Sequence, residues 1–452
     1  MAAMNDWDWQ LYPKTETFLS GLVRSFLDVN CFADHLRGDI EGFSSTRFID
    51  WVDSMEAPDG TVRKEDLLKL GYVREPKISA AGDVYLHPGA FFPILLRADN
   101  MYRLSIKVED LERFSVTNYL GYRKIDGERN GPLRSVELNR EEDCTLCAVE
   151  RHGTRSFNID PTFDVEEYTK ALNILSSRNR AFQNDMEGIE NLKDNIAALT
   201  DILTRPRVAD AFFRAERAYW QSKNHAGEVQ NSRQEVLGLG WGNHDHHTFR
   251  CSRENFGKVI AIFEEMGLTR RERFFAGTEA GWGAQVMEQS DSGLVVFADV
   301  DLGPKEAHTD FVDHELEPLE KMGTVGLWVG LHGESVLDAG MHHLAVGSNF
   351  KGMREALEAR EVVSMNPFSN FDFLKQSFTE AERWIPPKER VKRLVEAKLI
   401  PDMQASKFLE HGTVGSHLEI IQRNSGFKGF NQSSVSAIIR MTDPMKRSGI
   451  GA

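Results

Sequence analysis

The stretch Ser416-His417-Leu418-Glu419-Ile420-Ile421-Gln422-Arg423, close to the end of the 452-residue chain, is the starting point for predicting the fold. Its apolar residues Leu418, Ile420 and Ile421 indicate a buried strand. Glu419 lies in the middle of that strand. An ionised carboxylate is costly to bury unless a charge, a metal ion or good hydrogen bonds compensate. The sequence therefore predicts that other segments supply partners for this carboxylate.

Two earlier segments each combine an apolar strand pattern with a pair of adjacent histidines. They read Asp245-His246-His247-Thr248-Phe249-Arg250 and Gly340-Met341-His342-His343-Leu344-Ala345-Val346. The two segments align without a gap, and each precedes a helical pattern, at 253–266 and at 350–360. Further strands are expected at 271–275, 283–288 and 293–300. This internal repeat predicts two β-α-β-β-β units, at 241–302 and 339–423.

The alternation of side chains along a strand selects one histidine of each pair. If His246 faces inward, Thr248 and Arg250 share its side, whereas an inward His247 would bury Arg250 beneath the helix. An inward His343 leaves the apolar neighbours of the second strand to pack against its helix. We therefore expect His246, His343 and Glu419 to converge.

Two histidines and one carboxylate, with coordination positions left over, form the ligand set of non-haem iron(II) oxygenases. The alternative is that each histidine is a hydrogen-bonded core residue, which is the commoner role of a lone buried histidine. Two His-His strands in aligned repeats, together with a buried glutamate, favour the metal site.

The two-copy arrangement resembles the vicinal oxygen chelate superfamily. Within it, the segments around His343 and Glu419, with Gly429-Phe430 after them, are similar to the catalytic half of 4-hydroxyphenylpyruvate dioxygenase and hydroxymandelate synthase. The resemblance covers about residues 240–440. It implies Fe(II) held by His246, His343 and Glu419, and a substrate that chelates the metal through a 2-oxo acid or similar vicinal oxygens. It also implies O2 activation with oxidative decarboxylation and hydroxylation.

The chain departs from that family in several places. Asn431-Gln432-Ser433-Ser434 replaces a glycine-rich lead into the C-terminal helix, which we expect at 433–440, and residues 366–403 form an unfamiliar insertion. Arg250 instead resembles an arginine of the distantly related 2-oxoadipate dioxygenase/decarboxylase family, where it holds a substrate carboxylate.

Four residues are candidates for roles around the metal. We expect Arg250 to hold a carboxylate, Thr248 and Gln285 to make polar contacts, and Phe430 with the C-terminal helix to act as a gate. Arg250 has an equally weighted alternative, which is to neutralise a protein carboxylate.

Other functions remain open on the same scaffold. They are an extradiol ring-cleaving dioxygenase, a metal-dependent isomerase or lyase, and a binding protein without catalysis. Binding proteins of this superfamily usually lack the metal ligands, so the complete ligand set counts against the last.

The expected fold class is α+β, with paired β-α-β-β-β modules that form a cupped mixed sheet. Residues 1–160 are expected to form an N-terminal α+β domain with a degenerate, metal-free β-α-β-β module at 102–157. Residues 161–235 are expected to be a helical linker, with a coiled-coil dimer arm as the alternative. Residues 236–452 form the catalytic domain, with a helical insertion at 366–403. A capping signal at Thr15-Glu16-Thr17 predicts where the first helix begins.

The composition is that of an ordinary globular protein, with 41% hydrophobic and 27% charged residues. The net charge of −15 argues against nonspecific binding to nucleic acid or anionic membranes. The acidic N-terminus lacks the apolar core of a signal peptide, so a cytoplasmic location is expected. The expected partners are a small-molecule substrate and O2, and a homodimer is open. Cys144 and Cys147 have zinc-site spacing, but without a second pair we expect two reduced thiols in a strand.

Overall fold

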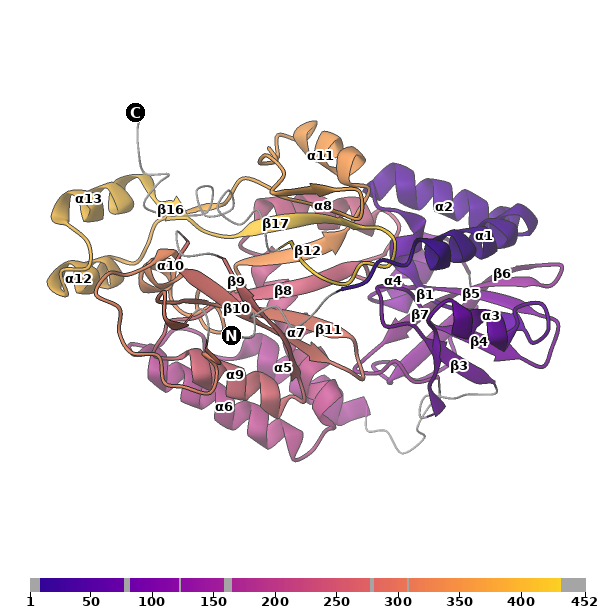
Figure 1. Ribbon diagram of the computed structural model, residues 1–452, viewed down its shortest axis with the longest axis horizontal. Helices are drawn as coiled ribbons and strands as arrows, with labels where there is room; N and C mark the ends of the chain where they lie inside the picture. Colours follow the sequence, from indigo (N-terminus) through magenta and orange to yellow (C-terminus); the bar gives the residue numbers. More distant parts are fainter. Residues whose placement is uncertain are drawn as a thin grey trace.

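The computed structural model describes residues 9–76, 82–121, 123–157, 165–276, 280–306 and 309–431. Figure 1 shows a seven-stranded sheet at one end of the molecule and an eight-stranded sheet beside it. Helices cover the eight-stranded sheet on one side. None of the helices in these ranges is long and apolar enough to cross a membrane.

The eight-stranded sheet consists of two modules with the same topology. In the order β13-β14-β17-β12-β8-β11-β10-β9, the first strand of each module pairs in parallel with its last strand, and the remaining pairs are antiparallel. The antiparallel pair β8–β12 joins the modules at the centre. The first module comprises β8 (His244–Arg250), α9 (Phe256–Glu265), β9 (Thr269–Phe275), β10 (Trp282–Gln289) and β11 (Leu294–Asp301). The second comprises β12 (His343–Gly347), α11 (Phe350–Glu358), β13 (Ser369–Phe371), β14 (Leu374–Phe378) and β17 (His417–Arg423). This is the paired β-α-β-β-β fold that the repeat predicts.

The structure differs from the helical insertion expected at 366–403. The added segment begins later in the chain, and it is only partly helical. The first part of the expected range contains β13 and β14, which are strands of the second module and pair with each other and with β17. The added segment lies between β14 and β17, and it contains two short paired strands and two helices. These are β15 (Arg383–Trp384), α12 (Lys388–Glu396), α13 (Asp402–His411) and β16 (Thr413–Val414). The two helices lie at the end of the molecule farthest from the seven-stranded sheet (Figure 1).

The seven-stranded sheet repeats this architecture. Its second half, β5 (Tyr102–Lys107), α4 (Leu111–Thr117), β6 (Leu133–Glu141) and β7 (Cys144–Arg151), is the predicted β-α-β-β module. Its first half is a complete β-α-β-β-β module, in which β1 pairs in parallel with β4. That half comprises β1 (Val52–Pro58), α3 (Lys64–Lys69), β2 (Val73–Arg74), β3 (Asp83–Leu86) and β4 (Ile94–Arg97). Sequence analysis missed it because strands of two to four residues are too short to show periodicity.

The first helix begins earlier than its apparent capping signal predicts. Helix α1 (Pro13–Val29) has Pro13 in its first turn, where a missing N–H costs nothing. Thr15 is inside the helix, and its hydroxyl donates to the carbonyl of Leu70 instead of capping. Helix α2 (Cys31–Ser44) and the 3-10 turn η1 (Phe48–Trp51) then lead into β1.

The helical region between the sheets packs inside this chain. It consists of α5 (Val165–Ser177), α6 (Asp185–Thr200), α7 (Arg205–Gln221) and α8 (His225–Glu235), with Pro206 in the first turn of α7. The apolar stripe of α6, including Leu192 and Ile196, is buried in the same core as Phe263 of α9. The stripe that suggested a coiled-coil arm is therefore covered by the chain itself. A further helix, α10 (Thr324–His332), follows β11.

The paired cysteines are buried in strand β7 as free thiols. Burial raises the pKa of each of Cys144 and Cys147 to about 12. Free thiols with a raised pKa are poor nucleophiles at neutral pH, and the position of the pair in β7 matches the strand expected for it.

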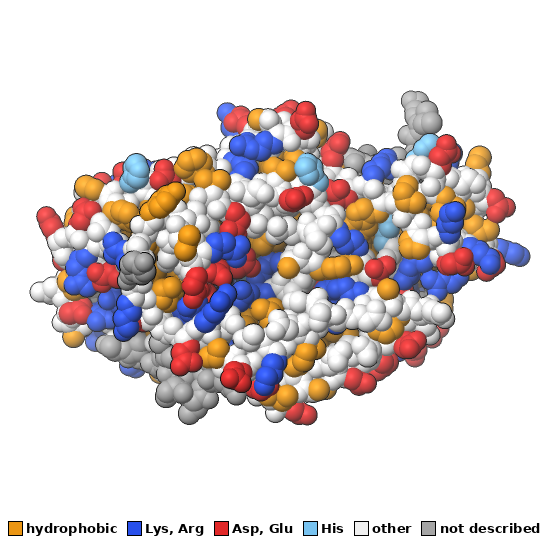
Figure 2. All heavy atoms as spheres, turned by 180° about the vertical axis from the view of Figure 1, so that it is seen from behind, with side chains coloured by type: hydrophobic (Ala, Val, Ile, Leu, Met, Phe, Trp, Pro, Cys, Tyr) orange, Lys and Arg blue, Asp and Glu red, His pale blue; other side chains and the backbone are white. Residues whose placement is uncertain are grey.

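The two faces of the eight-stranded sheet have different roles. Phe249, Leu344 and Leu418 point to the helix side and join its large apolar core. Residues that alternate with them point into the opposite, cupped face. On the molecular surface, Figure 2 shows Lys and Arg side chains interspersed with Asp and Glu.

Candidate metal centre

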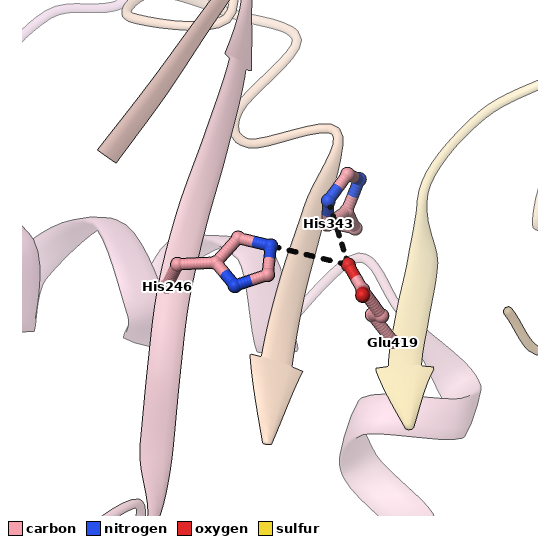
Figure 3. A group of neighbouring side chains, drawn as sticks. All are labelled: His246, His343 and Glu419. Carbon is pink, nitrogen blue, oxygen red and sulfur yellow. Dashed lines mark ion pairs between the residues drawn. The ribbon is translucent and has the colours of Figure 1, made fainter. Parts of the chain in front are cut away.

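Three side chains from three neighbouring strands meet on the cupped face (Figure 3). His246 comes from β8, His343 from β12 and Glu419 from β17. Nε2 of His246 lies 3.2 Å and Nε2 of His343 lies 3.1 Å from Oε2 of Glu419. One ligand atom from each residue fits within 4.8 Å of the other two. All three side chains are buried, so the arrangement is screened from solvent.

An irregularity in the central strand pair shapes the first ligand's surroundings. Ala345 of β12 pairs with His246, but the next residue, Val346, pairs with His244, so Asp245 is an extra residue on β8. An extra residue of this kind bends a strand and re-aims its side chains. The carboxylate of Asp245 thereby reaches the ring of the histidine next to it.

Asp245 orients His246 and is itself anchored. Its Oδ1 lies 2.8 Å from Nδ1 of His246, and Arg423 grips both of its oxygens at 2.8 and 3.1 Å. Burial opposes ionisation of Asp245, but Arg423 and His246 outweigh it and hold the pKa of this carboxyl far below its usual value. The carboxylate accepts the Nδ1 proton of His246, which directs Nε2 toward Glu419.

The second ligand has a histidine as its partner. Nδ1 of His343 lies 3.0 Å from Nδ1 of His342. Burial, followed by the charge of Arg250, keeps the pKa of His342 well below its ordinary value, so His342 is neutral and carries one proton. If His343 donates its Nδ1 proton to His342, its Nε2 is left with a free lone pair. The hydroxyl of Thr248 lies 2.8 Å from this Nε2 and would compete with a metal ion for it.

Glu419 is ionised because of its histidine neighbours. Burial alone would raise its pKa, but the two imidazoles, His246 first, hold the pKa far below the ordinary value. The amide of Gln376 donates to its Oε1 at 2.7 Å. In the part of the chain that the structure describes, no arginine or lysine forms an ion pair with this carboxylate. Its Oε2 is therefore directed at the two Nε2 atoms alone.

A cavity of about 70 Å³ adjoins the three ligands. Six of its thirteen lining side chains are Phe or Trp, and the other seven, including the three ligands, are polar. Burial raises the pKa of one of these, Asp299, to about 7, against the opposing charges of Arg250 and His246. The lining residues are His246, Thr248, Phe274, Trp282, Phe297, Asp299, His343, Phe368, Gln376, Phe378, Glu419, Phe430 and Asn431.

Comparison with known proteins gives structural likenesses only. No protein-family model and no curated protein sequence matches the chain. A variant of 4-hydroxymandelate synthase from Streptomyces coelicolor is similar over 88% of this chain and 98% of its own, with 12% identity and a TM-score of 0.29. Methylmalonyl-CoA epimerase from Mycobacterium tuberculosis is similar over 40% of this chain and 88% of its own, with 10% identity and a TM-score of 0.24. Both scores lie below 0.5, so the fold assignment rests on the strand order of the chain itself.

Of the four residues predicted around the metal, the structure brings Thr248 and Phe430 to the cavity. The ring of Phe430 lies 5.2 Å from that of His246 and 4.4 Å from that of Phe297. The helix expected at 433–440 lies outside the described residues. Gln285 is elsewhere, because the alternation of β10 places Ala284 and Val286 beside the cavity's aromatic residues and turns Gln285 away. Its amide donates to the carbonyls of Glu272 and Val286.

Arg250 is buried near the cavity without forming part of its lining. Its guanidinium lies 5.5 Å from the ring centre of Trp328. Its charge lowers the pKa of Asp299 relative to what burial alone would produce. This supports the alternative role, in which the arginine compensates a protein carboxylate.

Three residues that complete the site were not predicted from the sequence: His342, Gln376 and Asp299. The sequence contained a signal that could have identified Asp299 as a site residue. Asp299 follows the apolar run Val295-Val296-Phe297-Ala298 within one strand, just as Glu419 lies among the apolar residues of its own strand. For Gln376 there was no such signal, because it lies on a five-residue strand in what the sequence suggested was an insertion.

The cupped face of the seven-stranded sheet has a different chemistry. There, Glu56 of β1 is held by Arg97 at 2.7 Å and by Arg103 at 3.5 Å. The negative charge of Glu56 is compensated by two arginines. Glu419 instead faces two imidazole nitrogens, which can be neutral and bind a metal ion. The two sheets share a topology, but Glu56 and Glu419 differ in their strand positions and in their partners.

Proposed function

We propose that this protein is a non-haem Fe(II)-dependent dioxygenase that acts on a small 2-oxo acid or a similar metal-chelating substrate. The observation that carries the proposal is the convergence of two imidazole Nε2 atoms on one buried glutamate oxygen. Two histidines and one carboxylate on one side of an ion leave positions for a chelating substrate and O2. The resemblance of the segments around His343 and Glu419 to 4-hydroxyphenylpyruvate dioxygenase supports this choice of chemistry.

The donor set fits iron(II). Imidazole nitrogen suits iron, and a carboxylate oxygen adds the negative charge that offsets part of the ion's charge. Asp245 fixes the tautomer of His246, and His342 can do the same for His343. Iron(II) bound by these residues would supply O2 activation and polarise the oxygens of a chelating substrate.

The cavity walls determine what can approach the ligands. A volume of about 70 Å³ has room for on the order of five water molecules, which suits a small substrate. Phe297, Phe378 and Phe430 exclude water from most of this surface. Apart from the three ligands, four polar side chains line the cavity: Thr248, Asp299, Gln376 and Asn431. Chelation of the metal would orient the substrate together with these groups.

Asp299 is the candidate for proton transfer. Burial raises the pKa of its carboxyl to about 7, and the carboxyl faces the same cavity as the ligands. A group poised near the working pH can both give and take a proton. We assign Asp299 the role of giving its carboxyl proton to an oxygen of the substrate or product.

The test is a metal-binding titration followed by an activity screen. Fe(II) added anaerobically is expected to bind one to one, and replacement of the ligands by His246→Ala or Glu419→Gln is expected to abolish this binding. Glu334→Gln is the matched control, because Glu334 is another buried carboxyl but does not line the cavity.

The loaded protein is then screened with 2-oxo acids for O2 uptake and CO2 release. Uptake with release in equal amounts supports the proposal. Uptake without CO2 indicates ring cleavage, and turnover without O2 indicates an isomerase or lyase; either result overturns it. Unchanged Fe(II) binding in the ligand variants would overturn the metal site as well.

A further inference from the structure

A second and much larger cavity lies where the two sheets meet. Its volume is about 440 Å³, and its lining comes from strands of both sheets, including β1, β5 and β7 of one and β8, β9, β11 and β17 of the other, from α7 and from nearby loops. Seven of its side chains are Lys or Arg and four are Asp, an excess of three positive charges in a chain whose net charge is −15. The cations are Arg47, Lys107, Arg151, Arg155, Arg271, Arg423 and Lys428, and the carboxylates are Asp50, Asp53, Asp210 and Asp245.

Five of the seven cations are bound to carboxylates of the protein. Arg47 pairs with Asp50, Arg151 with both oxygens of Asp53, and Arg423 with both oxygens of Asp245. Two more cations share one glutamate just outside the lining: Arg271 and Lys428 both reach Glu288. These pairs give the cavity a rigid, polar wall.

Lys107 and Arg155 differ from the other five. Within the described residues, neither forms an ion pair or a hydrogen bond through its side chain. Lys107 ends strand β5, and burial lowers the pKa of its amine to about 8, while Asp53 opposes this effect. Arg155 packs so closely on Gly293 that a Cβ there would have no room, and Gly293 has a φ of +76° that suits glycine.

Carboxylates act on these two part-buried cations only from beyond ion-pair distance, Asp53 on Lys107 and Glu288 on Arg155. A buried charge without a direct partner is costly, so a bound anion would stabilise both. A wall with an excess of positive charge provides that opportunity for a ligand of opposite sign. Figure 2 shows Lys and Arg side chains recessed near the middle of the molecule's rear face. The volume is that of a site for a small organic molecule and is too small for a macromolecule.

We propose that this cavity binds a small organic dianion, a phosphate monoester or a dicarboxylate, through Lys107 and Arg155. One negative charge would meet the ammonium group of Lys107 and the other the guanidinium of Arg155. Guanidinium groups bind carboxylate and phosphate oxygens in pairs, which gives the ligand a defined orientation.

The lining of this cavity differs from that of the proposed iron site, although Asp245 lines it and also contacts His246. Phe430 is the one residue that both linings share, and none of the three metal ligands lines the larger cavity. The proposal therefore does not depend on the metal chemistry, and it is tested with metal-free protein.

The experiment is calorimetric titration of the full-length, metal-free protein at low ionic strength. Inorganic phosphate, phenyl phosphate and succinate are titrated separately, with chloride as the monoanion control. At least one dianion is expected to bind one to one. Lys107→Met and Arg155→Met are each expected to weaken that binding about tenfold or more. Lys351→Met is the control, because Lys351 is exposed on α11.

The Lys107→Met variant also separates binding from folding. Because it removes a part-buried charge without a partner, it is expected to unfold at a denaturant concentration no lower than that of the wild type. Tighter binding of phenyl phosphate would identify a phosphate ester, and tighter binding of succinate a dicarboxylate. Absence of dianion binding, equal binding of chloride, or undiminished binding by both Met variants would each overturn the proposal.

Discussion

Arg423 and Asp245 form a two-pronged ion pair that connects strand β17 to strand β8, with N–O distances of 2.8 and 3.1 Å. Asp245 also accepts a hydrogen bond from Nδ1 of His246. Arg423 therefore stabilises the position of a candidate iron ligand indirectly, through Asp245. The same pair lines the large cationic cavity. One ion pair thus belongs to both candidate sites.

Asp245→Asn is expected to weaken Fe(II) binding by about ten- to a hundredfold. The neutral amide leaves Arg423 without its partner and no longer selects the tautomer of His246, and changes to such partners of metal ligands have effects of this size. Competition with a chelator measures the affinity. Asp50→Asn is the control, because Asp50 pairs with Arg47 in the same cavity without touching a ligand. Equal affinity of both variants would contradict the positioning role.

Gln376→Met is expected to reduce both Fe(II) affinity and turnover. Without the amide donor at 2.7 Å, Oε1 of Glu419 loses the bond that restrains the carboxylate's rotation. Gln285→Met provides the comparison, since the amide of Gln285 is buried but bonds only backbone carbonyls in the described residues. Metal content is read by elemental analysis after gel filtration. If the two variants retain the same amount of iron, the assigned role of Gln376 is wrong.

His342→Phe is expected to weaken metal binding by about tenfold or more, because His343 would lose the acceptor for its Nδ1 proton. His342→Asn keeps an acceptor oxygen nearby and is expected to recover much of the affinity. His332→Phe tests for a general packing effect. His332 is also buried, and its Nε2 contacts the carbonyl of Val414 and the hydroxyl of Thr413. An equal loss of metal in the His332 and His342 variants would show that packing, and not a missing acceptor for His343, weakens the binding.

Glu334 makes stability depend on pH. Burial raises its pKa from 4.5 to about 7, against opposing hydrogen bonds from Ser252 and Asn255. Between these values the folded chain holds the proton and the unfolded chain does not. The contribution of Glu334 to stability is therefore complete below pH 4.5 and is lost as the pH rises through about 7, a change of about 3 kcal/mol.

The corresponding measurement is urea unfolding at pH 5 and pH 8. Wild-type protein is expected to lose stability between these values, and Glu334→Gln is expected to lose distinctly less. Glu355→Gln is the control, since Glu355 is exposed on α11. A Glu334→Gln variant that follows the wild-type pH profile would show that this carboxyl does not stay protonated in the folded chain.

The long, regular elements of the fold could be predicted from the sequence. Strands such as β8, β10 and β11 have seven or eight residues, which is enough for alternation to appear, and α9 shows a clear apolar stripe. The strands β2, β3, β4 and β13 have two to four residues each, too few for alternation to appear or for their pairing to be inferred. No local pattern reports such pairing, so one complete module was overlooked.

Alternation also accounts for which parts of the site could be predicted. It placed His246, His343 and Glu419 on one face, because each lies on a strand whose other face is apolar. It could not locate Gln376, whose strand was hidden inside the apparent insertion. The prediction that Gln285 belongs to the site is wrong, although its strand was predicted. Ala284 and Val286 on either side of it point toward the cavity's aromatic residues, so Gln285 points to the opposite face.

The position of β17 has a consequence for how the protein matures. This strand follows the added segment in the chain, yet it lies between β14 and β12 in the sheet. Its partners β14 and β12 are therefore synthesised before it. The strand edges that will pair with β17 stay unpaired until β17 emerges from the ribosome. A nascent chain that stops short of residue 417 would lack the glutamate and would expose two sheet edges prone to aggregation. When β17 inserts between β14 and β12, it brings Glu419 to His246 and His343 in the same late step.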